Sequence, residues 1–266
     1  MAITTRDGLI AAIAAGPSVK FSKASITTAA GFFYSHFRTA GMPAANSSTP
    51  ATTGVQLSRS SQGAMAIPAP SNTSYISSFE GVCAQLGTVV LADRLGEFGG
   101  LSGIVTTAQA VSALALPARA SSATDVELWL EVYAAGGATA SATVTASYTN
   151  QSGTSGRTAT LIGGIPASGV PVQRSYQFAL QAGDTGVKSV ESLTIGTSTG
   201  TAGNIGLVLR RSLITGAVPQ ANIGFFQGWA ETDLTICPDD ACLELLIMSG
   251  STSSGYVQGN FGIAQG

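Results

Sequence analysis

The carboxylates that come closest to a metal-binding cluster are Asp239, Asp240 and Glu244. A calcium loop places oxygen ligands at alternating positions over about twelve residues, and this segment lacks that spacing. Three further aspartates stand alone at predicted strand ends or turns: Asp125, Asp184 and Asp233. We therefore predict solvated turns at these positions, with no metal site and no other cofactor.

Acid–base or nucleophilic catalysis would depend on the single histidine, His36. The sequence has no Gly-x-Ser-x-Gly elbow and no phosphate-binding loop that ends in Gly-Lys-Ser/Thr. The aromatic-rich segment around His36, residues 29–38, has two interpretations: a site for an aromatic ligand or partner, or an element that packs into the core. No second polar group accompanies the histidine, so we predict core packing, no catalytic residues and no enzymatic activity.

Cysteines and tryptophans are the other residues with chemical potential. Cys83, Cys237 and Cys242 are an odd number and too few for a disulfide framework. The five-residue spacing of Cys237 and Cys242 permits a bridge, but small buried thiols are the preferred interpretation. Trp129 and Trp229 could stack on a sugar ring, although packing in a core or an interface explains both better.

Composition indicates a protein that is partly covered by other subunits. Only 10% of the residues are charged, whereas 44% are hydrophobic; a soluble domain usually has about a quarter charged residues. The formal net charge is −2 and no basic run occurs, so we expect no nucleic-acid partner. The apolar run at 9–15 is too short to cross a bilayer, and Asp7 before it argues against a secretion signal. We expect no membrane partner.

Strand periodicity is clearest at 126–133. The charged residues Glu127 and Glu131 fall on one side of this segment, and the even positions carry an apolar face, as in a half-buried strand. Segments 142–148 and 157–162 flank a polar turn, and 190–196 and 204–211 flank another, which predicts two hairpins. The pattern predicts an antiparallel β-sandwich or jelly roll whose interior contains these residues: Leu128, Leu130, Val132, Val144, Leu193, Ile195, Leu207 and Leu209.

The remaining elements predict a mainly β protein with an N-terminal helix and an extended arm. Thr5 or Asp7 can cap a short helix that ends at Gly16-Pro17. Residues 41–70 are rich in proline and nearly uncharged, so we predict an arm that contacts another chain; the alternative is an arm packed on its own domain. The helix, arm and accessory strands form a predicted region 1–118, and the sandwich a predicted domain 119–266.

Several segments resemble a group of tailed-bacteriophage and prophage structural proteins. These are Val-Glu-Leu-Trp-Leu-Glu-Val-Tyr (126–133), Ser-Tyr-Thr-Asn-Gln-Ser-Gly-Thr-Ser-Gly-Arg (147–157) and Leu-Gln-Ala-Gly-Asp-Thr-Gly-Val-Lys-Ser-Val (180–190). The opening Asp-Gly-Leu-Ile-Ala-Ala (7–12) and the ending Asp-Ala-Cys-Leu (240–243) extend the resemblance over most of the chain. No catalytic residues come with it.

The resemblance implies a structural protein of the bacteriophage virion, which is assembled in the host cytoplasm. Within the virion, the expected role is a capsid decoration or cement protein, since such proteins combine a compact β domain with an arm across capsomer junctions. Its expected partners are the major capsid protein or other virion proteins, and sister subunits in a homo-oligomer. We expect a homotrimer, because capsid lattices offer threefold junctions. The alternatives are a tail, baseplate or connector component, and a carbohydrate-binding spike or adhesin.

Overall fold

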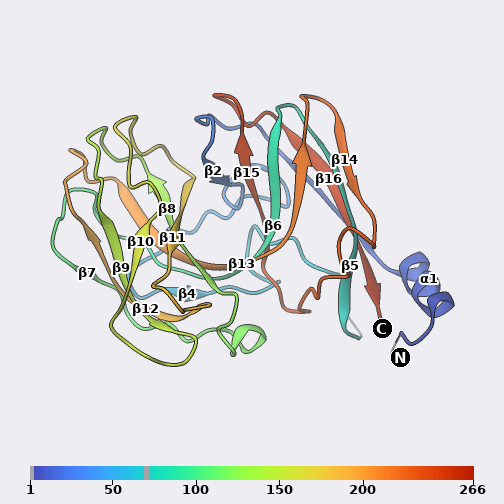
Figure 1. Cartoon of the computed structure of the whole chain (residues 1–266). Coiled ribbons are helices and arrows are strands. Elements are labelled where there is room, and N and C mark those ends of the chain that lie inside the picture. Colours follow the sequence, from blue (N-terminus) through green and yellow to red (C-terminus); the bar gives the residue numbers. More distant parts are fainter. Residues whose placement is uncertain (1–2, 69–71) are drawn as a thin grey trace. The chain divides into compact units, whose positions relative to one another are not determined.

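The computed structural model describes residues 3–68 and 72–266. The described part is mainly β with antiparallel strand pairings, and it contains one α-helix, α1 (Arg6–Ala15) (Figure 1). The predicted mainly β class with an N-terminal helix is thus confirmed. Residues 69 and 70, the end of the predicted arm, lie outside the described residues.

The chain divides into two compact units, and each draws on separate stretches of sequence. The first unit comprises Met1–Ser47, Ser58–Asp93 and Ser212–Gly266, and the second comprises Ser48–Leu57 and Arg94–Arg211. The predicted division at residue 118 does not coincide with this partition, because the C-terminal segment belongs with the N-terminal one. Sequence order alone does not reveal this, since antiparallel strands from both ends of a chain can pair.

The first unit contains a five-stranded antiparallel sheet in the order β14-β5-β16-β1-β3 (Figure 1). Its strands are β1 (Ser18–Lys23), β3 (Gly41–Met42), β5 (Ser74–Cys83), β14 (Gly224–Gln227) and β16 (Val257–Gln265). The C-terminal strand β16 lies between β1 and β5. The alternation in these strands places Val19 and Phe21 inside and leaves Lys20 and Ser22 exposed.

A second group of strands in the first unit has β15 (Leu243–Ser249) at its centre. It pairs with β2 (Phe33–Ser35) on one side and with β6 (Gly87–Glu97), through residues 87–93, on the other. Side chains of β15 share one hydrophobic core with the five-stranded sheet; the β15 members are Leu243, Leu245 and Ile247. Burial of this apolar area is the main stabilising contribution to the unit.

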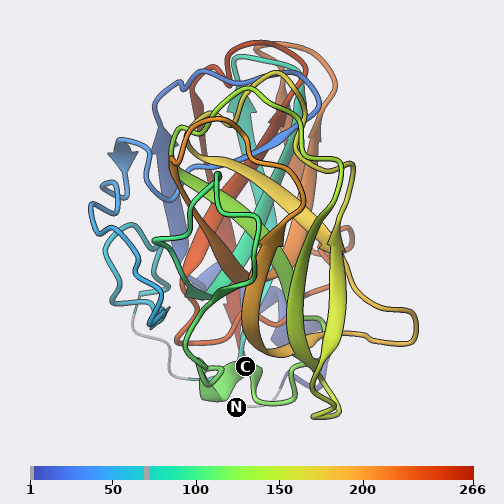
Figure 2. The same cartoon turned by 90° about the vertical axis from the view of Figure 1, so that its left-hand side faces the viewer.

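Helix α1 begins with the predicted cap, because the Thr5 hydroxyl accepts a hydrogen bond from the Gly8 amide at 3.0 Å. Helix α1 has no buried residue and lies beside β16, where the Ile263 amide donates to the Pro17 carbonyl at 3.0 Å (Figures 1 and 2). The helix therefore contacts the sheet without burying any of its own residues.

The second unit contains a sheet in the order β13-β8-β11-β10-β9-β12-β7. In Figure 2 its yellow-green strands β9 and β10 run side by side, as their register requires. The strands of this unit are β4 (Val55–Gln56), β7 (Gln109–Ala110), β8 (Glu127–Ala134), β9 (Val144–Asn150), β10 (Arg157–Leu161), β11 (Arg174–Ala179), β12 (Val187–Ile195) and β13 (Asn204–Val218). Only residues 204–211 of β13 are part of the second unit. A short 3-10 helix, η1, covers Ala118–Ala120. All eight predicted interior residues are at most 1% exposed, so that prediction is confirmed.

One of the two predicted hairpins is confirmed and the other is wrong. Strands β9 and β10 pair across the polar turn at 150–156. Strands β12 and β13 both form, but β12 pairs with β9 and β7, while β13 pairs with β8. The segment that connects β12 to β13 instead bonds to the backbone at residue 103, where the Thr199 amide donates to the Gly103 carbonyl at 2.8 Å.

Strand β8 corrects the prediction of a half-buried strand. Trp129 and Glu131, on the side predicted to face solvent, are only 4% and 1% exposed. Glu131 accepts hydrogen bonds from Arg94 at 2.8 Å and from Arg210 at 2.7 Å. The carboxylate can be buried because these arginines neutralise it.

The predicted arm packs on its own chain, which is the alternative interpretation of residues 41–70. In the first unit, the Met65 amide donates to the Leu243 carbonyl at 3.0 Å, and Ile67 belongs to the hydrophobic core. In the second unit, Leu57 is 4% exposed and its amide donates to the Leu95 carbonyl at 3.1 Å. Contacts with another chain are not needed to order this segment.

Candidate functional site

The aromatic segment around His36 is part of the core, as predicted. His36 is fully buried, and Tyr34 and Phe37 are at most 1% exposed. Burial, assisted by the nearby charge of Lys23, lowers the pKa of His36 from 6.5 to about 3. This histidine cannot reach a solvent-borne substrate in the described structure.

The carboxylates near the C-terminal end do not converge on a common point. Asp239 and Asp240 are exposed, and Asp239 accepts a hydrogen bond from the Ser74 hydroxyl at 3.3 Å. Glu244 is buried and accepts from the Ser35 hydroxyl at 2.7 Å. Within residues 3–68 and 72–266, no group of three or more His, Cys, Asp or Glu side chains could hold a metal ion.

The three cysteines are buried and none forms a disulfide, in agreement with the preferred interpretation. Burial raises the pKa of the Cys83 thiol, which donates to the Ser254 carbonyl at 3.3 Å. A thiol in this state is a small core residue rather than a nucleophile.

The two tryptophans differ in their exposure. Trp129 is buried, its indole N–H donates to Glu127 at 2.7 Å, and the Arg210 guanidinium lies 5.1 Å from its ring centroid. It is therefore unable to stack on a sugar. Trp229 is 53% exposed and keeps that capacity.

The aspartates at 125, 184 and 233 lie in turns, but Asp184 is not isolated. It accepts hydrogen bonds from Arg157 at 2.8 Å, from the Tyr148 hydroxyl at 2.5 Å and from the Asn150 amide at 2.7 Å. Asn150 Oδ1 in turn accepts from the Thr154 backbone amide at 2.9 Å, so the network stabilises the β9–β10 turn. Asp125 and Asp233 have positive φ angles of 62° and 51°, which aspartate tolerates better than most residues.

We expect the Asp184 carboxyl to titrate near pH 2. The Arg157 hydrogen bond, followed by that of Tyr148, lowers its pKa from 3.8 to about 2. Because the folded-state pKa is depressed, the network stabilises the fold above pH 3.8, and this contribution is lost as pH falls toward 2. A carbon-detected NMR titration should show an upward shift of the midpoint in Arg157→Gln; an unchanged midpoint would contradict the assignment.

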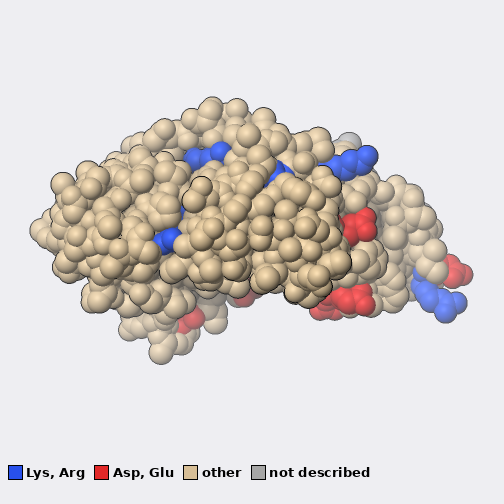
Figure 3. All heavy atoms as spheres, turned by 90° about the horizontal axis from the view of Figure 1, so that it is seen from above, with Lys and Arg blue, Asp and Glu red and all other residues tan. Residues whose placement is uncertain are grey.

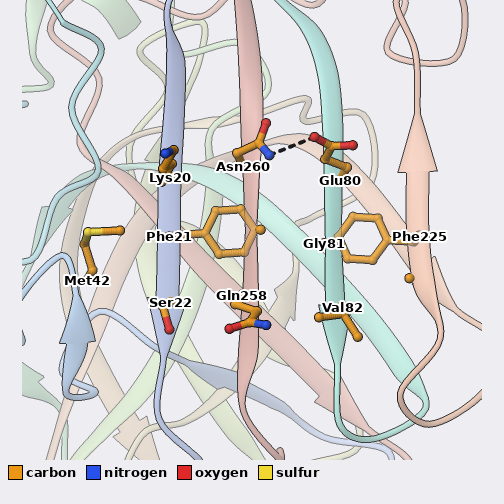
Figure 4. A pocket seen from close by; sticks show the side chains of 12 residues that line it. Lys20, Phe21, Ser22, Met42, Glu80, Gly81, Val82, Phe225, Gln258 and Asn260 are labelled. Carbon is orange, nitrogen blue, oxygen red and sulfur yellow. Dashed lines mark hydrogen bonds between the residues drawn. The ribbon is translucent and has the colours of Figure 1, made fainter.

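The outer face of the five-stranded sheet in the first unit carries the candidate site. Side chains from β1, β3, β5 and β16 line an open groove of about 550 Å³ (Figure 4), and we call it the sheet-face groove. Its lining side chains on that face are Lys20, Ser22, Met42, Glu80, Val82, Gln258 and Asn260. Their alternation with core residues on the same strands directs them outward.

The register of the sheet arranges these side chains in two adjacent rows. One row runs Phe226, Glu80, Asn260, Lys20 and the next runs Gly224, Val82, Gln258, Ser22, Met42. Tyr256 precedes β16 on the same face, because it alternates with the buried Val257. Phe226 and Tyr256 are 68% and 44% exposed.

Two glycines lie at the centre of the sheet, where rings of the hydrophobic core approach the backbone. Gly81 and Gly259 are paired across β5 and β16. A β-carbon on Gly259 would lie 2.8 Å from the Phe21 ring, and one on Gly81 would lie 3.2 Å from the Phe225 ring, which Figure 4 shows beside Gly81. The Glu80 and Gln258 carbonyl oxygens would be closer still, at 2.1 and 2.8 Å, so these two positions have no room for a side chain.

Hydrogen bonds fix part of the groove's polar surface. The Asn260 amide donates to Glu80 Oε1 at 2.7 Å, and Asn260 Oδ1 accepts from the Ser18 hydroxyl at 3.1 Å (Figure 4). Asn260 is therefore held in one orientation. Lys20 and Gln258 are exposed, and Lys20 and Glu80 provide one positive and one negative charge.

No family model, curated protein or solved structure matches this chain. The site must be judged on its own geometry. The groove was not predicted from the sequence, although Tyr256, Gln258 and Asn260 alternate there with Val257, Gly259 and Phe261. In the part of the chain that the structure describes, no helix has the length and apolar character needed to span a membrane.

Proposed function

We propose that this chain is a non-enzymatic structural component of a tailed-bacteriophage virion, and specifically a capsid decoration or cement protein that stabilises capsomer junctions. The proposal joins the sequence resemblance to the character of the molecular surface. It places the chain in the virion, after assembly in the host cytoplasm, with sister subunits and the major capsid protein as partners.

The observation that carries the proposal is the scarcity of charge on the surface. The sequence has 12 basic and 14 acidic side chains, and eight of these 26 are buried in the structure. The buried ones are Lys23, Asp93, Arg94, Glu97, Glu131, Arg174, Arg210 and Glu244. Figure 3 shows a face on which charged atoms are few. Charged residues are thus buried about as often as the rest of the chain, so burial of the other residues does not concentrate charge on the surface.

A surface of this kind favours contact with other subunits. Covering it removes apolar area from water while few charged groups lose their hydration. Charge repulsion keeps soluble monomers apart, and a surface with few charges provides little of that repulsion. We propose a homotrimer, since capsid lattices offer threefold junctions.

A β-sandwich is the finer architecture that we propose. Two groups of strands in the first unit share one hydrophobic core, as the layers of a sandwich do. This arrangement uses residues from both ends of the chain, in contrast to the predicted sandwich within 119–266.

The test is the amount and position of the chain in purified virions of the phage or prophage that encodes it. Quantitative mass spectrometry should give a copy number comparable to that of the major capsid protein, and a density map should place the chain on the outer capsid. Sedimentation of the isolated protein at micromolar concentration should show a trimer.

Other outcomes would distinguish the alternatives. A few copies per virion at the tail would support the tail, baseplate or connector alternative and contradict decoration. Absence of the chain from virions would contradict the structural proposal altogether. A monomer in solution would contradict the trimer.

A further inference from the structure

We propose that the sheet-face groove binds a short, uncharged, linear oligosaccharide across the strands of the five-stranded sheet. The inference rests on this face of the first unit alone. It goes beyond the virion role and would remain if that role proved wrong.

The length of the groove favours several sugar units over one. The row Phe226, Glu80, Asn260, Lys20 crosses four neighbouring strands. Three strand-to-strand steps span about 14 Å, which suits a short oligosaccharide rather than a monosaccharide. The groove volume of about 550 Å³ lies within the usual range of ligand sites.

The polar groups suit sugar hydroxyls, each of which can donate and accept a hydrogen bond. Glu80 is an acceptor held by Asn260, and Lys20 is a donor in the same row. In the adjacent row, Gln258 offers both a donor and an acceptor, and Ser22 adds a hydroxyl. Because these groups stand on paired strands, their spacing is fixed before a ligand arrives, which lowers the entropy cost of binding.

An exposed aromatic ring lies beside these polar groups. Phe226 is opposite Glu80 in the sheet and is 68% exposed, the largest exposure among the large hydrophobic side chains that are exposed in the described residues. The C–H face of a pyranose ring can cover it while the hydroxyls at the ring edge reach the polar rows. Tyr256, on the same face, provides a second ring next to the Gln258 row.

The charge of the groove argues for a neutral ligand. Lys20 contributes one positive charge and Glu80 one negative charge to the same row, so the charges of the row cancel. An anionic polymer would meet Glu80, and a cationic peptide would meet Lys20, whereas an uncharged sugar is repelled by neither. A purely apolar partner would remove Lys20 and Gln258 from water without offering them hydrogen bonds.

The experiment is an NMR titration of the ¹⁵N-labelled full-length protein with cellotriose, N,N′,N″-triacetylchitotriose and maltotriose. At least one trisaccharide should perturb the backbone amides of Glu80, Gln258 and Asn260, with a Kd of roughly 0.1–1 mM. Phe226→Ala should weaken this binding by about tenfold or more, and Gln258→Ala by several-fold. Both side chains are exposed, so the variants should keep the wild-type circular dichroism spectrum.

Ile162→Ala is the matched control, because Ile162 is 58% exposed but belongs to the second unit. It should bind as the wild type does. Three results would overturn the proposal: no perturbation of this face by any of the sugars up to about 10 mM, equal binding by wild type, Phe226→Ala and Gln258→Ala, or perturbation of the face by protein concentration alone. The last result would identify the face as an interface between copies of this chain.

Discussion

Replacing Glu131 by glutamine is expected to lower the free energy of unfolding of the second unit by about 3–5 kcal/mol. Glu131 is 1% exposed and accepts hydrogen bonds from Arg94 at 2.8 and 3.0 Å and from Arg210 at 2.7 Å. Arg94 also donates to Glu97 at 2.7 Å. Two arginines and two glutamates therefore balance one another away from water.

The size of the effect follows from the charge that remains. In Glu131→Gln, the charges of Arg94 and Arg210 stay buried, and only Glu97 is left among the two carboxylates to offset them. These two cations lose their hydration on folding, and one carboxylate does not compensate for that loss. The folded state is therefore destabilised. Losing a surface ion pair would cost less than about 1 kcal/mol.

Urea unfolding followed by tryptophan fluorescence measures this effect. A Trp229→Phe background leaves Trp129, which is buried in the second unit, as the sole tryptophan. Glu127→Gln is the matched control, because it makes the same chemical change on the same strand at a half-buried site, and glutamine can still accept from the Trp129 indole. If the two variants have similar stabilities, the buried cluster does not stabilise the unit as argued.

Strand β8 shows which features of the fold hydrophobic periodicity predicts and which it misses. The apolar positions of 126–133 were predicted correctly, because alternation is a local property of the backbone. The burial of Glu131 was missed, because its partners Arg94 and Arg210 lie 37 and 79 positions away in the sequence. A strand that is charged on one face looks solvated until those distant partners are known.

The groove was beyond sequence reasoning for the same reason. Asn260 and Glu80 are hydrogen-bonded across 180 positions, and Asn260 and Ser18 across 242. Alternation predicts which side chains of each strand share a face, but strand order decides which strands become neighbours. The order β14-β5-β16-β1-β3 joins residues from both ends of the chain, and no local signal fixes it.

The arm illustrates a composition with two physical meanings. Proline and low charge predicted an extended segment, and residues 41–68 do contain only two short strands, β3 and β4. The same apolar residues that suggested a partner chain, such as Met65 and Ile67, instead fill the core of the first unit. Composition indicates that such a segment is covered, and it does not identify what covers it.

Between pH 6.5 and about 4.5, the first unit is expected to lose about 2–3 kcal/mol of stability through one side chain, His36. His36 is fully buried, and neither ring nitrogen has a hydrogen-bond partner among the described residues. Burial, followed by the charge of Lys23, lowers its pKa from 6.5 to about 3. Lys23 is itself held by the Thr39 and Pro43 carbonyls at 3.2 and 2.7 Å.

The sign of the effect follows from proton uptake on unfolding. The folded-state pKa is depressed, so the unfolded chain binds a proton on His36 that the folded chain rejects. The stabilisation is complete above pH 6.5 and is lost as pH falls toward 3, with a limiting slope of about 1.4 kcal/mol per pH unit. Lost fully, it amounts to about 5 kcal/mol.

The single histidine makes the measurement specific, because ordinary carboxyl groups titrate mainly below about pH 4.5 and the α-amino group above about pH 7. Urea unfolding of the first unit, monitored through hydrogen exchange of amides in β1, β5 and β16, should show the expected slope of the free energy of unfolding against pH. His36→Gln should remove it, because glutamine does not titrate, whereas Ile76→Val should lower stability equally at every pH, since it trims a core side chain of the same unit. A wild-type slope that persists in His36→Gln would assign the acid sensitivity to another group and contradict the role of this buried ring.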